Sequence, residues 1–256
     1  MTWRELLQTL LFGYPMPPEM IDPRFPELLQ KIGGLGLTLV IALLSLTAGI
    51  LLGCVLALCR RETGENVVPV LHFIRRGLGI TATAFVEIIR GLPLMLLALL
   101  VFYLPYPITG RRFPGVILAV AAFSLYAGVY FSELIRSGFR TIPPGLREAG
   151  RVLGLRPRQI FLKIELPLVI RNMLPDVANL AVTVFRDTSM LSVVAVAELT
   201  YTGRQMLMSQ PMDYGLVLIL TMLLYWVPST LISFFLTARG NGGYVYRKNH
   251  LSFQKS

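Results

Sequence analysis

Five stretches of about 20 apolar residues, separated by shorter polar intervals, constrain the fold of this chain more than any other feature. A helix of about that length crosses a hydrocarbon core about 30 Å thick. Only helices and closed barrels satisfy the backbone in lipid. The composition agrees, since 54% of the residues are hydrophobic and only 15% are charged. We therefore predict an all-α polytopic membrane protein with about five transmembrane helices. The expected spans are residues 35–58, 80–104, 116–135, 174–196 and 216–236.

The polar intervals suggest how the chain is organised. Residues 1–34 are mixed and proline-rich, which predicts an amphipathic or irregular lead-in. Residues 35–238 form the expected membrane domain, which contains one long polar interval at 137–172, called the polar hairpin below. Residues 239–256 are expected to be a tail. No soluble segment is long enough to predict an independently folding domain.

The basic residues predict the orientation in the membrane. Outside the spans, 16 Lys and Arg residues fall in the intervals after the first and third spans and in the tail, and 6 fall on the opposite side. Cytoplasmic loops carry the excess of Lys and Arg. We therefore expect the N-terminus outside, and the polar hairpin and the C-terminus in the cytoplasm.

The polar hairpin carries clear helix signals. Pro143 and Pro144 suit the first turn of a helix, where a missing N–H has no cost. Gly154 can adopt the left-handed conformation that ends a helix. Pro157 then suits the start of a second helix, which Pro167 is expected to stop or kink. We predict two short helices that meet at a glycine.

The second of these helices is expected to be amphipathic. Ile160 and Ile164 lie one turn apart and Phe161 flanks them, which predicts an apolar stripe. The surrounding basic residues are Arg151, Arg156, Arg158 and Lys163. Two interpretations follow: a basic loop on the inner lipid surface, or a docking device for a cytoplasmic partner.

The order of residues in the polar hairpin favours docking. It resembles the EAA loop of the membrane subunits of ATP-binding-cassette (ABC) importers, with a glycine in place of the third alanine. The residues that carry the resemblance are Glu148, Ala149, Gly150, Gly154, Ile164, Leu166 and Pro167. The resemblance implies a fold similar to type I importers, in which these residues couple the subunit to a separate ATPase.

Three further segments resemble the branch of this family that imports polar amino acids, the histidine, glutamine, glutamate and arginine group. They are E-I-I-R-G-L-P-L at 87–94, Y-F-S-E-L-I-R at 130–136 and F-R-D-T-S-M at 185–190. The resemblance covers roughly residues 35–236. The chain departs from the branch at Leu92, where threonine is usual, and at 144–146, where a G-Q pair usually precedes E-A-A. The implied function is a permease subunit for polar amino acids.

The resemblance also implies partners that supply energy and cargo. No lysine of the chain follows a glycine, so the chain has no P-loop for ATP. ATP and Mg²⁺ are expected on a pair of ATPase subunits, and this chain is expected to bind no cofactor. The other implied partners are a second permease subunit, identical or related, an extracytoplasmic substrate-binding protein, membrane lipid and the amino acid itself. Nucleic acid is not expected, and the implied location is a bacterial inner membrane.

Charged and polar residues inside the expected spans are candidates for the substrate path. They are Glu87, Arg90, Glu133, Arg186, Asp187, Thr188 and Ser189. Charge within a span is costly unless it faces protein or water. An amino acid is a zwitterion, so its site needs both signs of charge, which this set offers. The alternative is that the charged members form ion pairs that hold the helices together.

Other function classes find little support. An ion channel would explain charges in the spans, but it needs no two-helix cytoplasmic loop. An embedded enzyme would need a catalytic set, and no Ser–His–Asp set, H-E-x-x-H motif or paired carboxylates are evident. Cys54 and Cys59 are five residues apart on one helix, a rise of about 7.5 Å, which is too far for a disulfide. We predict neither catalytic residues nor a metal site.

Overall fold

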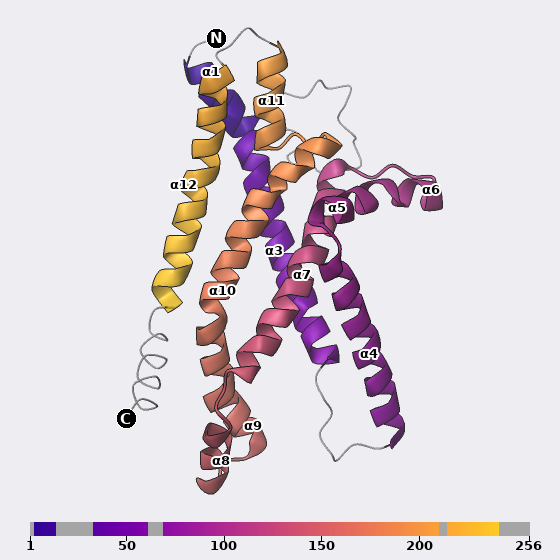
Figure 1. Cartoon of the computed structure of the whole chain (residues 1–256), viewed down its shortest axis with the longest axis vertical. Coiled ribbons are helices and arrows are strands. Elements are labelled where there is room, and N and C mark those ends of the chain that lie inside the picture. The colour runs from indigo at the N-terminus through magenta and orange to yellow at the C-terminus, as the bar shows by residue number, and fades with distance from the viewer. Residues whose placement is uncertain (1–2, 14–32, 61–68, 210–213, 241–256) are drawn as a thin grey trace.

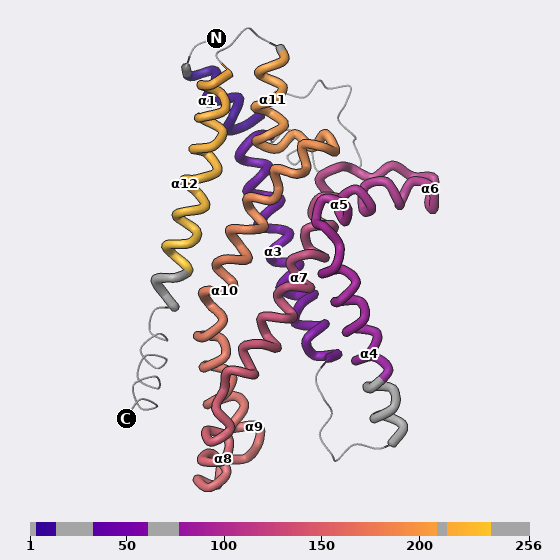
Figure 2. The backbone as a smooth tube through the Cα atoms, in the orientation of Figure 1, coloured from indigo at the N-terminus to yellow at the C-terminus, as the bar shows by residue number. Residues whose placement is uncertain are grey.

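The protein consists of helices joined by short non-helical segments in the residues that its structure, a computed structural model, describes: 3–13, 33–60, 69–209 and 214–240 (Figure 1, Figure 2). The helices, in chain order, are α1 (Trp3–Phe12), α3 (Gly34–Cys59), α4 (Pro69–Gly91), α5 (Leu94–Tyr103), α6 (Pro105–Thr109), α7 (Gly115–Arg140), α8 (Pro144–Val152), α9 (Pro157–Ile160), the π-helical turn η2 (Phe161–Glu165), α10 (Leu166–Asp187), the 3₁₀ helix η3 (Thr188–Val194), α11 (Leu199–Ser209) and α12 (Tyr214–Gly240).

Four helical stretches in the described residues are long and apolar enough to cross a membrane: Gly34–Cys59, Gly115–Arg140, Pro157–Val194 and Tyr214–Leu236. A bent helix pair makes a fifth if it is counted as one span. The prediction of an all-α polytopic membrane protein with about five spans is confirmed. The first and last spans agree with the predicted limits to within two residues, and the third extends beyond residue 135.

The second expected span, residues 80–104, is broken in the structure. Gly77–Gly91 and Leu94–Thr109 meet at an angle of 107°. Pro93 lies at the break with an extended ψ of 133°, as N-cap of α5. Proline has no N–H to donate and disfavours the α conformation in the residue before it. The second span is therefore a bent pair of helices, and α5 and α6 extend sideways from α4 (Figure 1).

Helices α3 and α7 form the centre of the molecule and pack against each other more extensively than any other pair. Small residues allow this approach. A Cβ atom at Gly49 would lie 2.6 Å from the Cβ of Ala127, and one at Gly53 would lie 2.7 Å from the carbonyl oxygen of Gly128. In lipid, close backbone approach replaces the hydrophobic drive for helix association. The small residues of α3 therefore allow its close packing on α7.

The remaining helices extend this core. Helix α10 packs on α7 and α12, and α5 packs on α7. At the end of the bundle away from the polar hairpin, α1 packs on α3 and α11 through Leu6 and Leu10, which are buried together with Leu199 and Met206. Helix α1 forms part of the predicted lead-in, most of which, residues 14–32, lies outside the described residues, as does the tail from residue 241 onward.

Candidate functional site

The polar hairpin lies at one end of the molecule, beyond the ends of α7 and α10 (Figure 1). Its first helix, α8, begins at Pro144 and ends before Gly154, which has a φ of +74°. The N–H of Leu155 donates to the Gly150 carbonyl at 3.0 Å, and the N–H of Gly154 donates to the Arg151 carbonyl at 2.9 Å. These bonds satisfy carbonyls at the helix end. The predicted left-handed turn at Gly154 is confirmed.

The second half of the polar hairpin differs from the prediction. Pro157 begins α9, as expected. Pro167 does not stop that helix, because the chain continues helically from Pro157 to Val194. The π-helical turn η2 intervenes, and the Leu166 N–H donates to the Phe161 carbonyl five residues earlier. Pro167 therefore falls in the first turn of α10, where a missing N–H is tolerated. The polar hairpin is continuous with a transmembrane helix.

The apolar stripe of the polar hairpin faces protein. Ile160 is only 2% exposed. An added Cβ at Gly150 would lie 3.0 Å from Ile160 and 3.4 Å from Ile164. Phe161 stacks on Phe139 of α7, with ring centroids 5.8 Å apart. The stripe therefore packs α8 against α9 and η2, and it is not free to lie on lipid.

An ion pair that sequence reasoning missed closes the polar hairpin. Arg147 Nε donates to Glu165 Oε1 at 2.6 Å, and the Glu165 side chain is 7% exposed. The two residues are 18 positions apart, so they meet only because α8 folds back on η2. Glu165 is the buried partner, whereas the Arg147 side chain is 56% exposed. This contact, together with the packing of Ile160 and Ile164 on Gly150, holds the two halves of the polar hairpin against each other.

The outer face of the polar hairpin is open. Glu148 and Ala149 are exposed, and within the described residues Glu148 has no hydrogen bond or ion pair. Val152 and Leu153, at the tip, are 87% and 77% exposed. Ile164 and Leu166 are half-buried, and Pro167 is exposed. An acidic residue beside exposed apolar side chains is suited to contact another protein.

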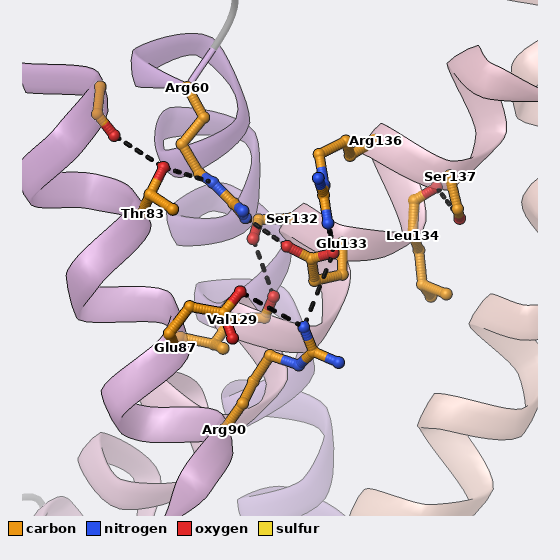
Figure 3. A network of polar contacts seen from close by, with 11 residues as sticks. Arg60, Thr83, Glu87, Arg90, Val129, Ser132, Glu133, Leu134, Arg136 and Ser137 are labelled. Atoms are coloured by element: carbon orange, nitrogen blue, oxygen red, sulfur yellow. Dashed lines mark hydrogen bonds and ion pairs between the residues drawn. The ribbon is translucent and has the colours of Figure 1, made fainter. Parts of the chain in front are cut away.

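A second candidate region is an ion-pair cluster around Glu133 on α7 (Figure 3). One carboxylate oxygen accepts from Arg60 at the end of α3. The other accepts from Arg136 at 2.7 Å and lies 3.7 Å from Nη1 of Arg90 on α4. Glu87 is 3.7 Å from the same Arg90 atom. One carboxylate thus joins three helices.

The Glu133 cluster contains both buried and exposed side chains. The side chains of Arg60 and Glu133 are 7% and 17% exposed, whereas those of Arg90 and Glu87 are 38% and 59% exposed. Arg60 also donates to Thr83 of α4 at 3.3 Å. The structure brings together three predicted path residues, Glu87, Arg90 and Glu133, and adds Arg60 and Arg136. Arg136 ends the Y-F-S-E-L-I-R segment, but nothing in the sequence links Arg60 to it.

The Arg186–Ser189 segment lies where α10 changes into η3. These four polar residues therefore coincide with a change of helix type. Arg186 is exposed and donates to Ser229 of α12 at 3.1 Å. Asp187 is half-buried and, within the described residues, forms neither an ion pair nor a hydrogen bond. Thr188 is buried and donates to the Phe185 carbonyl at 2.8 Å, while Ser189 is half-buried.

Arg186 and Asp187 therefore do not neutralise each other. The two sets of charged path residues are also separate. Tyr126 of α7 interacts electrostatically with Asp187 and packs on Tyr130, with ring centroids 4.5 Å apart. Glu133 lies seven residues, about two turns, further along α7. The structure does not join the Arg186–Ser189 segment to the Glu133 cluster.

A buried carboxylate beyond η3 was missed by sequence reasoning. Glu198 is fully buried and accepts the hydroxyl of Tyr225 on α12 at 2.7 Å. It also accepts the backbone N–H groups of Thr200 and Tyr201 at 2.9 and 2.8 Å, so it caps α11. Burial raises the pKa of Glu198 to about 7, and the hydrogen bonds oppose that rise. Glutamate is not a common N-cap residue, so no helix-start signal marks Glu198 in the sequence.

The described parts of the chain contain no group of three or more His, Cys, Asp or Glu that could hold a metal ion. Cys54 and Cys59 are free.

Comparison with known proteins agrees with these features. Residues 73–239 match the family described as "Binding-protein-dependent transport system inner membrane component". The chain is 30% identical over 230 residues to the L-cystine transport system permease protein TcyB of Bacillus subtilis (strain 168), covering 89% of this chain and 91% of that protein. It is 31% identical over 188 residues to the glutamine transport system permease protein GlnP of Escherichia coli (strain K12), and the match covers 73% of this chain and 80% of that protein.

Solved structures show the same fold. A crystal structure of an amino acid ABC transporter with histidines has a TM-score of 0.69 and 25% identity, covering 80% of this chain and 89% of that chain. A structure of the inward-facing MetNI methionine ABC transporter has a TM-score of 0.66 at 21% identity, and the match covers 87% of this chain and 99% of that chain. This second match supports the fold alone. On this evidence, the chain belongs to the family of inner membrane components of binding-protein-dependent transport systems, the permease subunits of ABC importers.

Proposed function

We propose that this protein is the permease subunit of an ATP-driven importer of amino acids. The similar permeases named above belong to transport systems for cystine and glutamine, and another, 27% identical over 212 residues, is the arginine transport system permease protein ArtQ of Bacillus subtilis (strain 168). The E-I-I-R-G-L-P-L and F-R-D-T-S-M segments support the same class of cargo. The proposal covers amino acids as a class.

The observation that carries the proposal is the rigid polar hairpin with an open outer face. Glu148 and Ala149 lie on that face, while Gly150, Ile160 and Ile164 are used to pack its two halves. Because the polar hairpin continues into α10, a displacement at its tip is transmitted along a transmembrane helix. We infer that Glu148, Ala149 and the tip dock on an ATPase subunit. Gly150, Gly154, Ile164, Leu166 and Pro167 maintain the shape that docks.

We propose the remaining partners from the resemblance and the family. ATP binds with Mg²⁺ and is hydrolysed on a pair of ATPase subunits in the cytoplasm, and this chain binds no cofactor. A second permease subunit completes the path, and an extracytoplasmic protein delivers the amino acid. The N-terminus lies outside and the C-terminus inside, in keeping with the distribution of Lys and Arg.

The Arg186–Ser189 segment is the favoured part of the substrate path. Asp187 has no cationic partner in the described chain, and Arg186 is exposed. An uncompensated carboxylate near an exposed guanidinium matches the amino and carboxylate groups of a zwitterion. The Glu133 cluster is already neutralised by arginines, and we infer that it mainly holds α3, α4 and α7 together.

The proposal is tested with the permease and ATPase subunits purified together and reconstituted in vesicles. We expect the ATPase subunit to co-purify, and the vesicles to take up one or more of a panel of labelled amino acids only when ATP is supplied. An absence of any co-purifying ATPase, together with a steady ion conductance, would support a channel instead.

Charge reversal at Glu148 tests the docking face. We expect Glu148→Lys to lower ATP-driven uptake at least about tenfold while the membrane core stays folded, because the new charge opposes docking. Arg112→Glu is the matched control, since it reverses an exposed charge beside α6. Normal uptake by Glu148→Lys would remove this residue from the interface.

A further inference from the structure

Two polar links join α12 to the two ends of η3. At the start of η3, Arg186 donates to Ser229 at 3.1 Å. Beyond its end, Tyr225 donates to Glu198 at 2.7 Å. Tyr225 and Ser229 are one helical turn apart, and the Ser229 hydroxyl donates to the Tyr225 carbonyl at 2.7 Å. The segment that contains Asp187, Thr188 and Ser189 is thus bracketed by contacts to one turn of α12.

Glu198 also holds the chain on its other sides. Its carboxylate caps α11 through the N–H groups of Thr200 and Tyr201. Its neighbours bind the start of α3: the N–H of Gly34 donates to the Ala197 carbonyl at 2.9 Å, and the N–H of Leu199 donates to the Thr38 hydroxyl at 3.1 Å. The backbone of the turn between η3 and α11 is therefore bonded to α3, while the Glu198 carboxylate and the Thr200 hydroxyl, 3.0 Å from the Tyr225 hydroxyl, contact α12.

We propose that Glu198 is a positioning residue for transport: through Tyr225 it holds the far end of the η3 segment against α12, as Arg186 does at the near end. This inference rests on the proposed function, because the segment it positions is the favoured substrate path. Removing the Glu198 carboxylate leaves the N–H groups of Thr200 and Tyr201 without their acceptor, which costs more than the net value of one hydrogen bond. Removing the Tyr225 hydroxyl breaks the contact to α12, while the carboxylate keeps its two backbone donors.

The ionisable surroundings of Glu198 give the link a dependence on pH. Tyr225 is the ionisable side chain that faces it from α12. On α11, Arg204 is exposed and its guanidinium lies over the Tyr201 ring at 5.9 Å. On α1, Arg4 and Glu5 are exposed, while η3 and the first turns of α3 carry no ionisable side chain. No described cation offsets the burial that raises the pKa of Glu198 to about 7. The hydrogen bonds favour the ionised carboxylate, but burial penalises the charge more strongly. The buried, linked arrangement of Glu198 therefore loses stability relative to a hydrated one as pH rises through 7.

The experiment compares Glu198→Gln, Glu198→Ala and Tyr225→Phe in the reconstituted complex. We expect uptake to fall about tenfold in Glu198→Ala and Tyr225→Phe, while the ATPase subunit stays bound. Glutamine stays neutral at every pH, so the ratio of wild-type to Glu198→Gln uptake is expected to fall about threefold or more between pH 6 and pH 8. Tyr214→Phe is the matched control, because Tyr214 is on α12 and 64% exposed.

A readout independent of cargo is the protection of the Thr200 and Tyr201 amides against hydrogen exchange. Protection is expected to fall in Tyr225→Phe at both pH values, and in the wild type only at pH 8. The proposal would be overturned if Tyr225→Phe kept the uptake and the amide protection of the wild type. It would also be overturned if the ratio of wild-type to Glu198→Gln uptake did not change with pH. If the Glu198→Ala complex fails to assemble, Glu198→Gln and Tyr225→Phe still test the proposal. If the wild type takes up no amino acid, the proposed function fails, and amide protection still tests the hydrogen bond between Tyr225 and Glu198.

Discussion

Glu133 and Asp187 are both acidic residues in predicted spans, and the structure treats them differently. Glu133 is surrounded by Arg60, Arg90 and Arg136 from three helices. Asp187 has no ion pair or hydrogen bond within the described chain, although Arg186 is its neighbour in sequence. A carboxylate that is already paired stabilises a helix bundle, whereas one left unpaired remains available to a ligand. The same residue type therefore supports two different inferences.

The largest effect is expected from Glu133→Gln. Arg60 is only 7% exposed, so loss of the carboxylate leaves a buried guanidinium without its counter-ion. We expect a loss of stability of about 3 kcal/mol or more, seen as a lower thermal unfolding temperature of the purified complex and poorer assembly. Unchanged stability would show that water already hydrates Arg60, and the contrast with Asp187 would then fail.

A more selective loss is expected from the double change Arg186→Met with Asp187→Leu. Asp187 has no ion pair or hydrogen bond within the described chain, and Arg186 is exposed with a hydrogen bond to Ser229, so removing both charges leaves no buried charge without its counter-ion. We therefore expect a folded, ATPase-bound complex that no longer transports. Uptake in vesicles is measured beside a check of assembly. Transport at the wild-type rate would make the two residues incidental, and failure to assemble would place them with Glu133 as structural residues.

Glu198 offers a third kind of buried carboxylate, held by hydrogen bonds without a cation. Its pKa is raised from 4.5 to about 7 on folding, so the folded protein retains a proton that the unfolded chain has lost. Stability contributed by this group is therefore fully present below about pH 4.5, falls as pH rises to about 7, and is level above that. The total change is at most about 3 kcal/mol.

The measurement for Glu198 is thermal unfolding across pH 5 to 8 for the wild type and Glu198→Gln. The variant is expected to show a flatter profile in this window. Asp176→Asn, which removes an exposed charge on α10, is the control and should keep the wild-type profile. A profile that is unchanged by Glu198→Gln would show that Glu198 is hydrated in the folded protein.

Local signals in the sequence predicted local structure well. The prolines and Gly154 of the polar hairpin indicated where α8 begins and ends and where α9 begins, because proline and left-handed glycine act within a few residues. Pro93 and Pro167 show the limit. Both disturb a helix, yet one produces a sharp bend and the other lies in a helix that continues through a π-helical turn. Which outcome occurs depends on the packing around the proline.

Contacts between distant residues could not be predicted in the same way. The Arg147–Glu165 and Arg60–Glu133 pairs join positions 18 and 73 residues apart. The sequence identified Glu133 as unusual because it is charged within a span, but the partner depends on how α3 and α7 align. Glu198 was missed because it lies just outside a span, where a glutamate is unremarkable. Its burial follows from the packing of α11 against α3 and α12.

The smallest effect is expected from Glu87→Gln. It makes the same chemical change as Glu133→Gln, but at the exposed edge of the Glu133 cluster. The Glu87 side chain is 59% exposed and lies 3.7 Å from Arg90, which is itself 38% exposed. Exposed ion pairs contribute little, so stability should change by no more than about 0.5 kcal/mol. Thermal unfolding and uptake are measured beside Glu133→Gln. If the Glu87→Gln complex assembles normally but loses uptake, then Glu87 contacts the cargo, and the substrate path extends into the Glu133 cluster. If both stability and uptake are unchanged, the cluster acts through its buried members, because only they are removed from water.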